Sequence, residues 1–156
     1  MPITLRDALP EDESFLFEVY ASTRVQEMAL VPWDDEQRNS FLTMQFAAQH
    51  SHYREQFPDA SYSVIFRDDL PLGRFYVLRE KREIRILDIT VLPEYRNGGI
   101  GTALLRDLLD EAAQSEKRVL IYVETFNPSL RLFERLGFKS IAEEGINFLM
   151  EWRPAT

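Results

Sequence analysis

The sequence of 156 residues contains no cysteine. Disulfide bonds, thiolate metal ligands and a cysteine nucleophile are therefore excluded together. Histidine is almost as scarce, and because His50 and His52 have no third type of metal ligand nearby in the sequence, we expect no metal site. No apolar run approaches the roughly 20 residues that span a bilayer, and the first residues do not resemble a signal peptide. We therefore expect a cytoplasmic protein that does not act on a membrane.

Positive charge is also in short supply, with 18 Lys and Arg against 26 Asp and Glu and a formal net charge of −8. This charge repels a phosphate backbone, so we expect no nucleic-acid partner. It favours cationic small molecules or cationic protein segments, although acidity can also serve solubility alone. The length suits one domain, and no repeat, linker or low-complexity tract divides the chain. We predict a single domain over residues 1–156.

Hydrophobic spacing and turn residues divide the first part of the chain into helices and strands. An acidic triplet at residues 11–13 suits a helix start, and an apolar loop at residues 31–33 is either a plug in the core or one wall of a pocket. In chain order we predict a strand at 3–5, helices carrying residues 15–20 and 34–47, an antiparallel hairpin of strands at 62–66 and 73–78, and an apolar strand at 84–92.

The second part of the chain alternates helices with strands. We predict a helix at 99–116, a strand at 118–124, a short helix that begins with Asn127 as its cap and stops at Leu136, and strands at 138–142 and 147–152. The strand–helix–strand order makes the strands on either side of the long helix parallel, through a right-handed crossover. The predicted fold class is α+β: a mixed, mostly antiparallel seven-stranded sheet with a central parallel pair, flanked by about four helices.

A glycine-rich turn between the last strand of the first part and the long helix is the most informative segment. Pro93 ends the strand, and Gly98, Gly99 and Gly101 then lead directly into the helix. Backbone amides without intrahelical partners lie there at the positive end of the helix dipole, and the glycines let an anion approach them. Arg96 adds a permanent cation. The pattern predicts a phosphate or pyrophosphate site; the alternative is a tight turn whose glycines only permit close packing.

Two motifs together resemble those of the GNAT superfamily of N-acetyltransferases. Residues 91–101 read Val-x-Pro-x-Tyr-Arg-x-x-Gly-Ile-Gly, which is similar to the superfamily's Arg/Gln-x-x-Gly-x-Gly/Ala motif after such a strand. Residues 127–138 resemble its segment from an asparagine to a Gly-Phe pair, at the usual distance. The order of elements agrees over nearly the whole chain. The resemblance implies a GNAT-like fold and an enzyme that moves an acetyl group from acetyl-CoA to a primary amine of a small molecule or a protein.

The resemblance also implies how a coenzyme A thioester would bind. Amides of the glycine turn would hold the pyrophosphate, and an amide near Ile89 or Val91 would polarise the thioester carbonyl. The pantetheine arm would fill the gap where the two parallel strands separate, with Asn127 either contacting the arm or capping its helix, or doing both. The implied coenzyme-binding residues are Ile89, Thr90, Val91, Arg96, Asn97, Gly98, Gly99, Ile100, Gly101, Thr102, Asn127 and Ser129.

One position departs from the superfamily's pattern. Phe133 stands where many members carry a tyrosine that protonates the departing thiolate, and phenylalanine has no proton to give. Three alternatives remain open. The thiolate leaves without a dedicated acid, since an ordinary thiol has a pKa of about 8.5. Otherwise Tyr122 or water supplies the proton, or the protein is a regulatory module that binds an acyl-CoA and catalyses little.

Two carboxylates are candidates for the general base. Asp88 and Glu124 each interrupt an otherwise apolar strand near its C-terminal end. Burial there would raise the pKa of a carboxylate toward the range useful for accepting an ammonium proton. The alternative is a structural role, in which either carboxylate pairs with Arg85, Arg118 or a backbone amide.

The acceptor pocket of the superfamily lies between the segment that joins the first two helices and the loop that joins the last two strands. The corresponding residues here are Trp33, Asp35, Glu36, Glu143 and Glu144. If they converge, they form an aromatic-floored anionic mouth that suits a cationic amine. The alternative is that the acidic residues near Trp33 only begin the second helix and that the two glutamates are solvated. The identity of the acceptor and the oligomeric state, a homodimer included, stay open.

Overall fold

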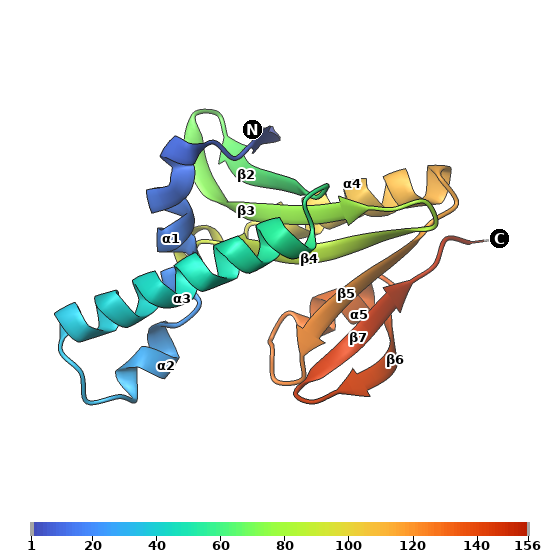
Figure 1. Cartoon of the computed structure of the whole chain (residues 1–156). Helices are drawn as coiled ribbons and strands as arrows, with labels where there is room; N and C mark the ends of the chain where they lie inside the picture. Colours follow the sequence, from blue (N-terminus) through green and yellow to red (C-terminus); the bar gives the residue numbers. More distant parts are fainter. Residues whose placement is uncertain (1, 156) are drawn as a thin grey trace. The chain divides into compact units, whose positions relative to one another are not determined.

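The computed structural model describes residues 2–155, and within them seven strands form one mixed sheet in the order β1-β2-β3-β4-β5-β7-β6 (Figure 1). The strands are β1 (Ile3–Asp7), β2 (Ser61–Arg67), β3 (Leu70–Arg79), β4 (Glu83–Val91), β5 (Arg118–Glu124), β6 (Lys139–Glu144) and β7 (Asn147–Trp152). The helices are α1 (Glu13–Ser22), α2 (Val25–Ala29), α3 (Asp35–Gln56), α4 (Ile100–Gln114) and α5 (Leu130–Arg135), with the 3-10 turns η1 (Pro10–Asp12) and η2 (Pro93–Tyr95). The predicted fold class is confirmed.

Backbone contacts divide the chain into two compact units. The first unit comprises Met1–Arg74 and Thr90–Arg96, and the second comprises Phe75–Ile89 and Asn97–Thr156. The strands β3 and β4 therefore each contribute residues to both units.

The first unit packs α1 and α3 over an antiparallel strand pair. β1 and β2 pair from Ile3 opposite Arg67 to Asp7 opposite Ser63. One core cluster of this unit contains Leu16, Tyr20, Phe46 and Val64. The rings of Phe17 and Phe46 meet edge to face with centroids 5.7 Å apart, so the only buried residue of α3 lies where this helix contacts α1. The helical spacing of the apolar residues predicted this face of α1 because it repeats every three to four positions.

The start of α3 is defined by a capping box. Asp34 Oδ1 accepts a hydrogen bond from the backbone N–H of Gln37 at 2.8 Å, and Gln37 Oε1 accepts one from the N–H of Asp34 at 3.0 Å. These two bonds satisfy amides that the helix itself leaves without partners. The acidic residues at 34–36 therefore begin the second predicted helix, as one of the two sequence interpretations expected.

The second unit is built on a parallel strand pair extended by an antiparallel pair. β4 and β5 are parallel, from Glu83 opposite Arg118 to Ile86 opposite Ile121. β5 and β6 each pair antiparallel with β7, and the β6–β7 register shifts at a bulge between Ser140 and Ala142. α4 packs against β5 through a buried stripe. This stripe consists of Ile100, Leu104, Leu105, Leu108, Leu109 and Ala112, as predicted.

The structure adds one helix to the prediction and corrects two predicted boundaries. A fifth helix, α2, was missed because its five residues are too few for a helical period to show. α5 begins at Leu130 rather than at Asn127, because Asn127 Oδ1 accepts the N–H of Ser129 at 2.8 Å and forms a turn ahead of the helix. Glu143 and Glu144 belong to β6 rather than to a loop, because the turn lies at Gly145, which has a left-handed φ of 63°.

Candidate functional site

The turn that leads into α4 presents a row of free backbone amides. Gly99 is the N-cap of α4 with a left-handed φ of 80°, no side chain caps the helix, and Asn97 is also left-handed with a φ of 65°. Within residues 2–155, the amides of residues 97–102 donate no hydrogen bond. Free amides at the positive end of a 15-residue helix form a ready site for an anion.

The space in front of this turn is open. A Cβ atom added to Gly99 or to Gly101 would meet no atom of the described chain within 4 Å. Close packing therefore does not require glycine at either position. At position 99 the left-handed φ favours glycine instead. At Gly101 neither neighbouring atoms nor backbone conformation demands glycine. The open space above Gly101 is the feature that a bound anion would explain.

The segment before the turn is anchored by its own side chain. Arg96 Nε donates a hydrogen bond to the carbonyl oxygen of Val91 at 2.9 Å, which ties the residue back to the end of β4. The two terminal nitrogens of Arg96 have no partner among the described residues. The predicted cation is thus present and exposed, but part of its guanidinium is committed to bracing the strand end.

Gly73 of β3 fixes the position of the same strand end and was missed by the sequence analysis. A Cβ atom on Gly73 would overlap the carbonyl oxygen of Thr90 and would lie 2.9 Å from the Cα atom of Val91. The neighbouring Leu72 accepts a hydrogen bond from the N–H of Leu92 at 2.8 Å. An isolated glycine inside a predicted strand signals such a close backbone approach, so the signal was present in the sequence.

The two parallel strands stay paired only over their first residues. In the described part of the chain, the register between β4 and β5 ends at Ile86 opposite Ile121, although both strands continue beyond this point. Tyr122 to Glu124 remain paired with β7, from Leu149 to Asn147. The end of the pairing agrees with the predicted separation of the parallel strands.

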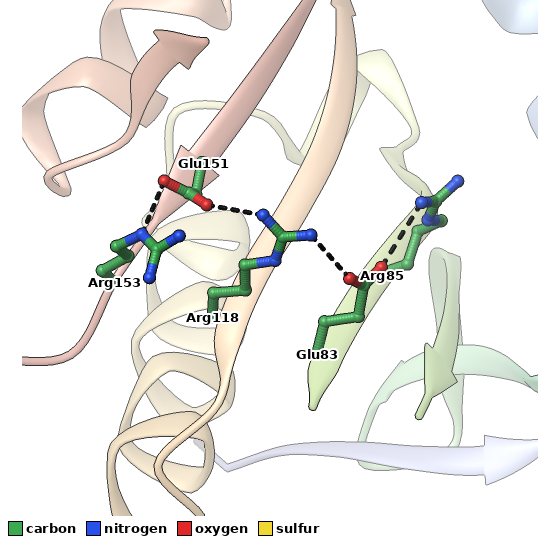
Figure 2. Close-up of polar contacts among 5 residues, drawn as sticks. All are labelled: Glu83, Arg85, Arg118, Glu151 and Arg153. Atoms are coloured by element: carbon green, nitrogen blue, oxygen red, sulfur yellow. Dashed lines mark hydrogen bonds and ion pairs between the residues drawn. The ribbon is translucent and has the colours of Figure 1, made fainter. Parts of the chain in front are cut away.

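A chain of ion pairs joins the other end of these strands (Figure 2). Arg118 donates to Glu83 and to Glu151, each at 2.9 Å, and Arg153 donates to Glu151 at 2.9 Å. Arg85 lies 3.3 Å from Glu83. Burial raises the pKa of Glu151, but the hydrogen bonds from Arg153 and Arg118 outweigh it and hold this pKa below its ordinary value. The chain of ion pairs links the start of β4 and β5 to the end of β7.

The base candidates lie on the same two strands. Asp88 and Glu124 are half-buried rather than buried. Arg85 and Arg118, which the structural alternative offered as their partners, pair with Glu83 and Glu151 instead.

The two aromatic residues considered for the proton transfer have opposite environments. Phe133 is 3% exposed and meets Phe138 edge to face at 5.4 Å, so it is part of the core of the second unit. Tyr122 is 46% exposed on β5. A hydrogen bond to Glu144 on β6 is the largest cause that raises the pKa of Tyr122, and the charge of Arg85 opposes it. Tyr122 is thus exposed and lies close to a carboxylate.

The candidate acceptor residues fall into both units. In the first unit, Trp33 packs on Phe41 with ring centroids 5.1 Å apart, and the fully exposed Asp35 lies 3.6 Å from Arg38. Glu36 is exposed in the first turn of α3. In the second unit, Glu143 and Glu144 are exposed on β6. Their convergence on one acceptor stays a prediction.

The sequence also matches a known family over most of its length. Residues 23–138 match the sequence model of the acetyltransferase (GNAT) family. The chain belongs to this family. The resemblance identified from the two motifs is therefore confirmed, and the turn before α4 and the strands β4 and β5 all lie inside the matched region of this GNAT acetyltransferase.

Known proteins resemble this GNAT acetyltransferase in sequence and in fold. It is 31% identical over 86 residues to the cysteine-rich protein 2-binding protein of Mus musculus, an alignment that covers 54% of this chain but spans only 11% of that protein. The N-acetyltransferase PaiA of Thermoplasma acidophilum, in complex with coenzyme A, superposes with a TM-score of 0.72 at 22% identity, over 98% of this chain and 99% of that one. The ribosomal-protein-S18-alanine N-acetyltransferase of Escherichia coli superposes with a TM-score of 0.64 at 17% identity, over 99% and 96%. The structural likenesses establish the fold.

No group of three or more His, Cys, Asp or Glu side chains within residues 2–155 is placed to hold a metal ion. None of the helices in that range has the length and apolar character needed to cross a bilayer.

Proposed function

We propose that this GNAT acetyltransferase moves the acetyl group of acetyl-CoA to a primary amine by direct attack of the amine nitrogen on the thioester carbon. The carbon–nitrogen bond forms and the carbon–sulfur bond breaks. The ammonium loses two protons: one passes to a base, and the other balances the proton that the departing thiolate takes up. The observation that carries the proposal is the open space above Gly101, beside the free amides of residues 97–102. The names of the neighbouring N-acetyltransferases, one of them holding coenzyme A, support the same reaction.

The residues of the turn fit the diphosphate of coenzyme A. The amides of residues 97–102 would donate to its oxygens, and the free terminal nitrogens of Arg96 would add charge-assisted hydrogen bonds. The end of β4 from Ile89 to Val91 would carry the amide that polarises the thioester carbonyl. This amide would donate a hydrogen bond to the carbonyl oxygen as negative charge develops on it in the transition state. Coenzyme A supplies the activated thioester, and the protein supplies position and polarisation.

Tyr122 is the acid that the arrangement of side chains favours. A tyrosine hydroxyl is protonated near neutral pH, and that of Tyr122 would give its proton to the thiolate as the carbon–sulfur bond breaks. The nearby carboxylate of Glu144 on β6 would orient this hydroxyl. Asp88 and Glu124 stay the candidates for the base, either directly or through water.

A second candidate function has one observation in its favour. Phe133 is buried in the core against Phe138, so the position that carries the acid in many relatives cannot donate a proton here. If neither Tyr122 nor water replaces that acid and the thiolate does not leave unaided, the protein would bind an acyl-CoA and regulate a partner.

One experiment separates the two functions. Acetyl-CoA binding is measured by calorimetry, and release of coenzyme A is then followed with a panel of small amines and lysine-containing peptides. Turnover with any amine supports the transferase, whereas binding without turnover supports the regulatory module. Failure to bind acetyl-CoA contradicts both.

A further inference from the structure

The chain of ion pairs in the second unit contains more arginines than glutamates (Figure 2). In order, it runs through Arg85, Glu83, Arg118, Glu151 and Arg153. Three cations therefore share two carboxylates, and one positive charge has no counterion within the chain of ion pairs. Arg118 bonds to both glutamates, and 69% of the Arg153 side chain is exposed to water, which can compensate its charge. Arg85 is the half-buried end of the chain of ion pairs.

The guanidinium of Arg85 has more hydrogen-bond donors than partners. Its Nη2 donates to Glu83 at 3.3 Å, a longer bond than the 2.9 Å bond that Arg118 makes with the same glutamate. Its Nε is buried and finds no partner in the described chain, and its Nη1 makes no hydrogen bond there. Buried donors are normally satisfied, and only 30% of this side chain is exposed. A structural role for Arg85 leaves these unused donors unexplained, whereas an anion bound at its terminal nitrogens would use the open part of the fork.

Arg85 shares one face of the sheet with Tyr122 and Glu124. In the parallel strand pair Arg85 lies opposite Leu120, and Tyr122 and Glu124 follow Leu120 along β5 at intervals of two residues. Side chains at such intervals lie on the same face of a strand. The base candidate Glu124 and the acid candidate Tyr122 are thus on the face to which the guanidinium of Arg85 belongs.

Glu144 of β6 completes this face. Glu124 and Glu144 are both opposite Asn147 of β7, so their side chains lie on the same side of the sheet. The carboxylate of Glu144 is the largest cause that raises the pKa of Tyr122, and the positive charge of Arg85 opposes it, so both groups lie close to the tyrosine hydroxyl. Arg85, Tyr122, Glu124 and Glu144 all belong to the second unit.

The sign of the charge changes along this face. Arg85 lies level with Leu120, and Glu124 ends β5 four residues later, about 13 Å further along the strand. An arginine and a glutamate side chain that extend toward each other over this distance leave room for a small molecule. A simple amine would give Arg85 no anion, and a simple carboxylate would give the glutamates no cation. A molecule that carries both groups at the two ends of a short carbon chain matches the face.

We propose that Arg85 binds the carboxylate of a small amino acid whose amine lies beside Glu124 and Glu144. Where this names the amino acid as the acceptor, the inference rests on the proposed acetyl transfer. The carboxylate accepts charge-assisted hydrogen bonds from the terminal nitrogens of Arg85, which holds the amine end near the base candidate Glu124. Arg85 is then a residue that determines which amines are acetylated.

The test compares three amino acids with their primary amides. Glycine, β-alanine and γ-aminobutyrate place the carboxylate at increasing distance from the amine, and each amide keeps the spacing without the negative charge. In the presence of coenzyme A, calorimetry should show that at least one acid binds with a dissociation constant tenfold or more below that of its amide, a difference of about 1.4 kcal/mol. With acetyl-CoA, kcat/KM for the release of coenzyme A should favour the same acid over its amide.

Three variants assign this preference to Arg85. Arg85→Gln should abolish the preference for the acid in binding and in kcat/KM. Arg85→Lys keeps the charge but not the planar fork, so it should retain part of the preference. Arg82→Gln removes an exposed arginine from the turn before β4 and should leave the preference unchanged. Because each ratio compares two ligands on the same protein, a loss of folded protein affects both ligands equally and cancels.

The outcomes separate this inference from the proposed acetyl transfer. If the wild-type protein acetylates the acids and the amides equally well, the inference is overturned and the acetyl transfer stands. A preference for the acids that survives Arg85→Gln also overturns it. If the acids bind more tightly through Arg85 but no amine releases coenzyme A, the carboxylate site is supported and the acetyl transfer is contradicted.

Discussion

Gly73 allows the carbonyl oxygen of Thr90 to approach its backbone so closely that any Cβ atom at position 73 would overlap this oxygen. Gly73→Ala should therefore displace the end of β4 and lower the free energy of unfolding by about 1–3 kcal/mol, as overpacking does. The affinity for acetyl-CoA should fall with it, since residues 89–91 are the proposed thioester edge. Urea unfolding and calorimetry measure the two effects. Val77→Ala, at a buried position of the same strand, shows whether a loss of stability alone reduces the affinity.

Gly101 offers the cleanest test of the proposed diphosphate site. Alanine is the better helix former, so Gly101→Ala should leave the free energy of unfolding unchanged or raise it by up to about 1 kcal/mol. Gly101→Val places a branched side chain in the open space and should abolish acetyl-CoA binding in a folded protein. If the folded Gly101→Val variant binds acetyl-CoA with unchanged affinity, the diphosphate does not bind at this turn. Gly99→Val is less informative, because the left-handed φ of 80° strains any branched residue there.

Tyr122 and Phe133 can be compared directly as proton donors. If Tyr122 is the acid, Tyr122→Phe should lower kcat about 100-fold, within the usual range for a general acid, and leave the affinity for acetyl-CoA unchanged. The basic limb of the pH–rate profile should disappear in this variant. Phe133→Tyr should change kcat little and cost about 1–3 kcal/mol of stability if the new hydroxyl finds no partner in the core. A kcat for Tyr122→Phe equal to that of the wild type would mean that the thiolate leaves without this acid.

The ion pairs of Glu151 predict a loss of stability in acid. Its pKa in the folded protein lies below the ordinary value of 4.5, so the stabilisation is complete above pH 4.5 and is lost as the pH falls through the lowered pKa. Glu151→Gln should cost about 1 kcal/mol at pH 7, a figure reduced for the solvent exposure of Arg153 and Arg118, and almost nothing at pH 3. Urea unfolding at several pH values measures this difference. Glu94→Gln, at an exposed position of η2, serves as the matched control for the loss of a carboxylate.

The acidic residues offered as an acceptor mouth can be tested one unit at a time. Asp35→Asn removes a fully exposed charge at the start of α3, and Glu143→Gln removes one on β6. If both residues attract a cationic amine, each change should raise KM for a linear triamine and weaken the salt dependence of kcat/KM, while the affinity for acetyl-CoA stays the same. An unchanged KM in both variants would mean that these acidic residues do not attract the acceptor and that the net charge of −8 serves solubility.

Some features of the fold could be predicted from the sequence because their causes are local. The buried stripe of α4 repeats with the helical period, and Asp34 caps α3 within three residues of its own position. The boundaries that were wrong lie where a single side chain redirects a turn, as Asn127 does before α5. The helix α2 has only five residues, which are too few to show a helical period of apolar residues.

Other features depend on residues that the fold brings together from distant parts of the chain. Arg118 binds Glu83 and Glu151, which are 35 and 33 positions away in the sequence. No pattern of sequence spacing predicts these ion pairs. Tyr122 comes close to Glu144 because their strands, β5 and β6, both pair with β7.

The sequence by itself determined the glycine turn before α4, the parallel strands around that helix and the family, because glycine conformations, helix dipoles and hydrophobic periods act over a few neighbouring residues. Only the tertiary structure decided that Gly101 faces open space while Gly73 lies against Thr90, and that Phe133 is core while Tyr122 is exposed. The free volume around an atom depends on residues that are distant in the sequence and are brought close by the fold. A residue's type specifies what it can do, and its packing specifies which of these roles it is placed to perform.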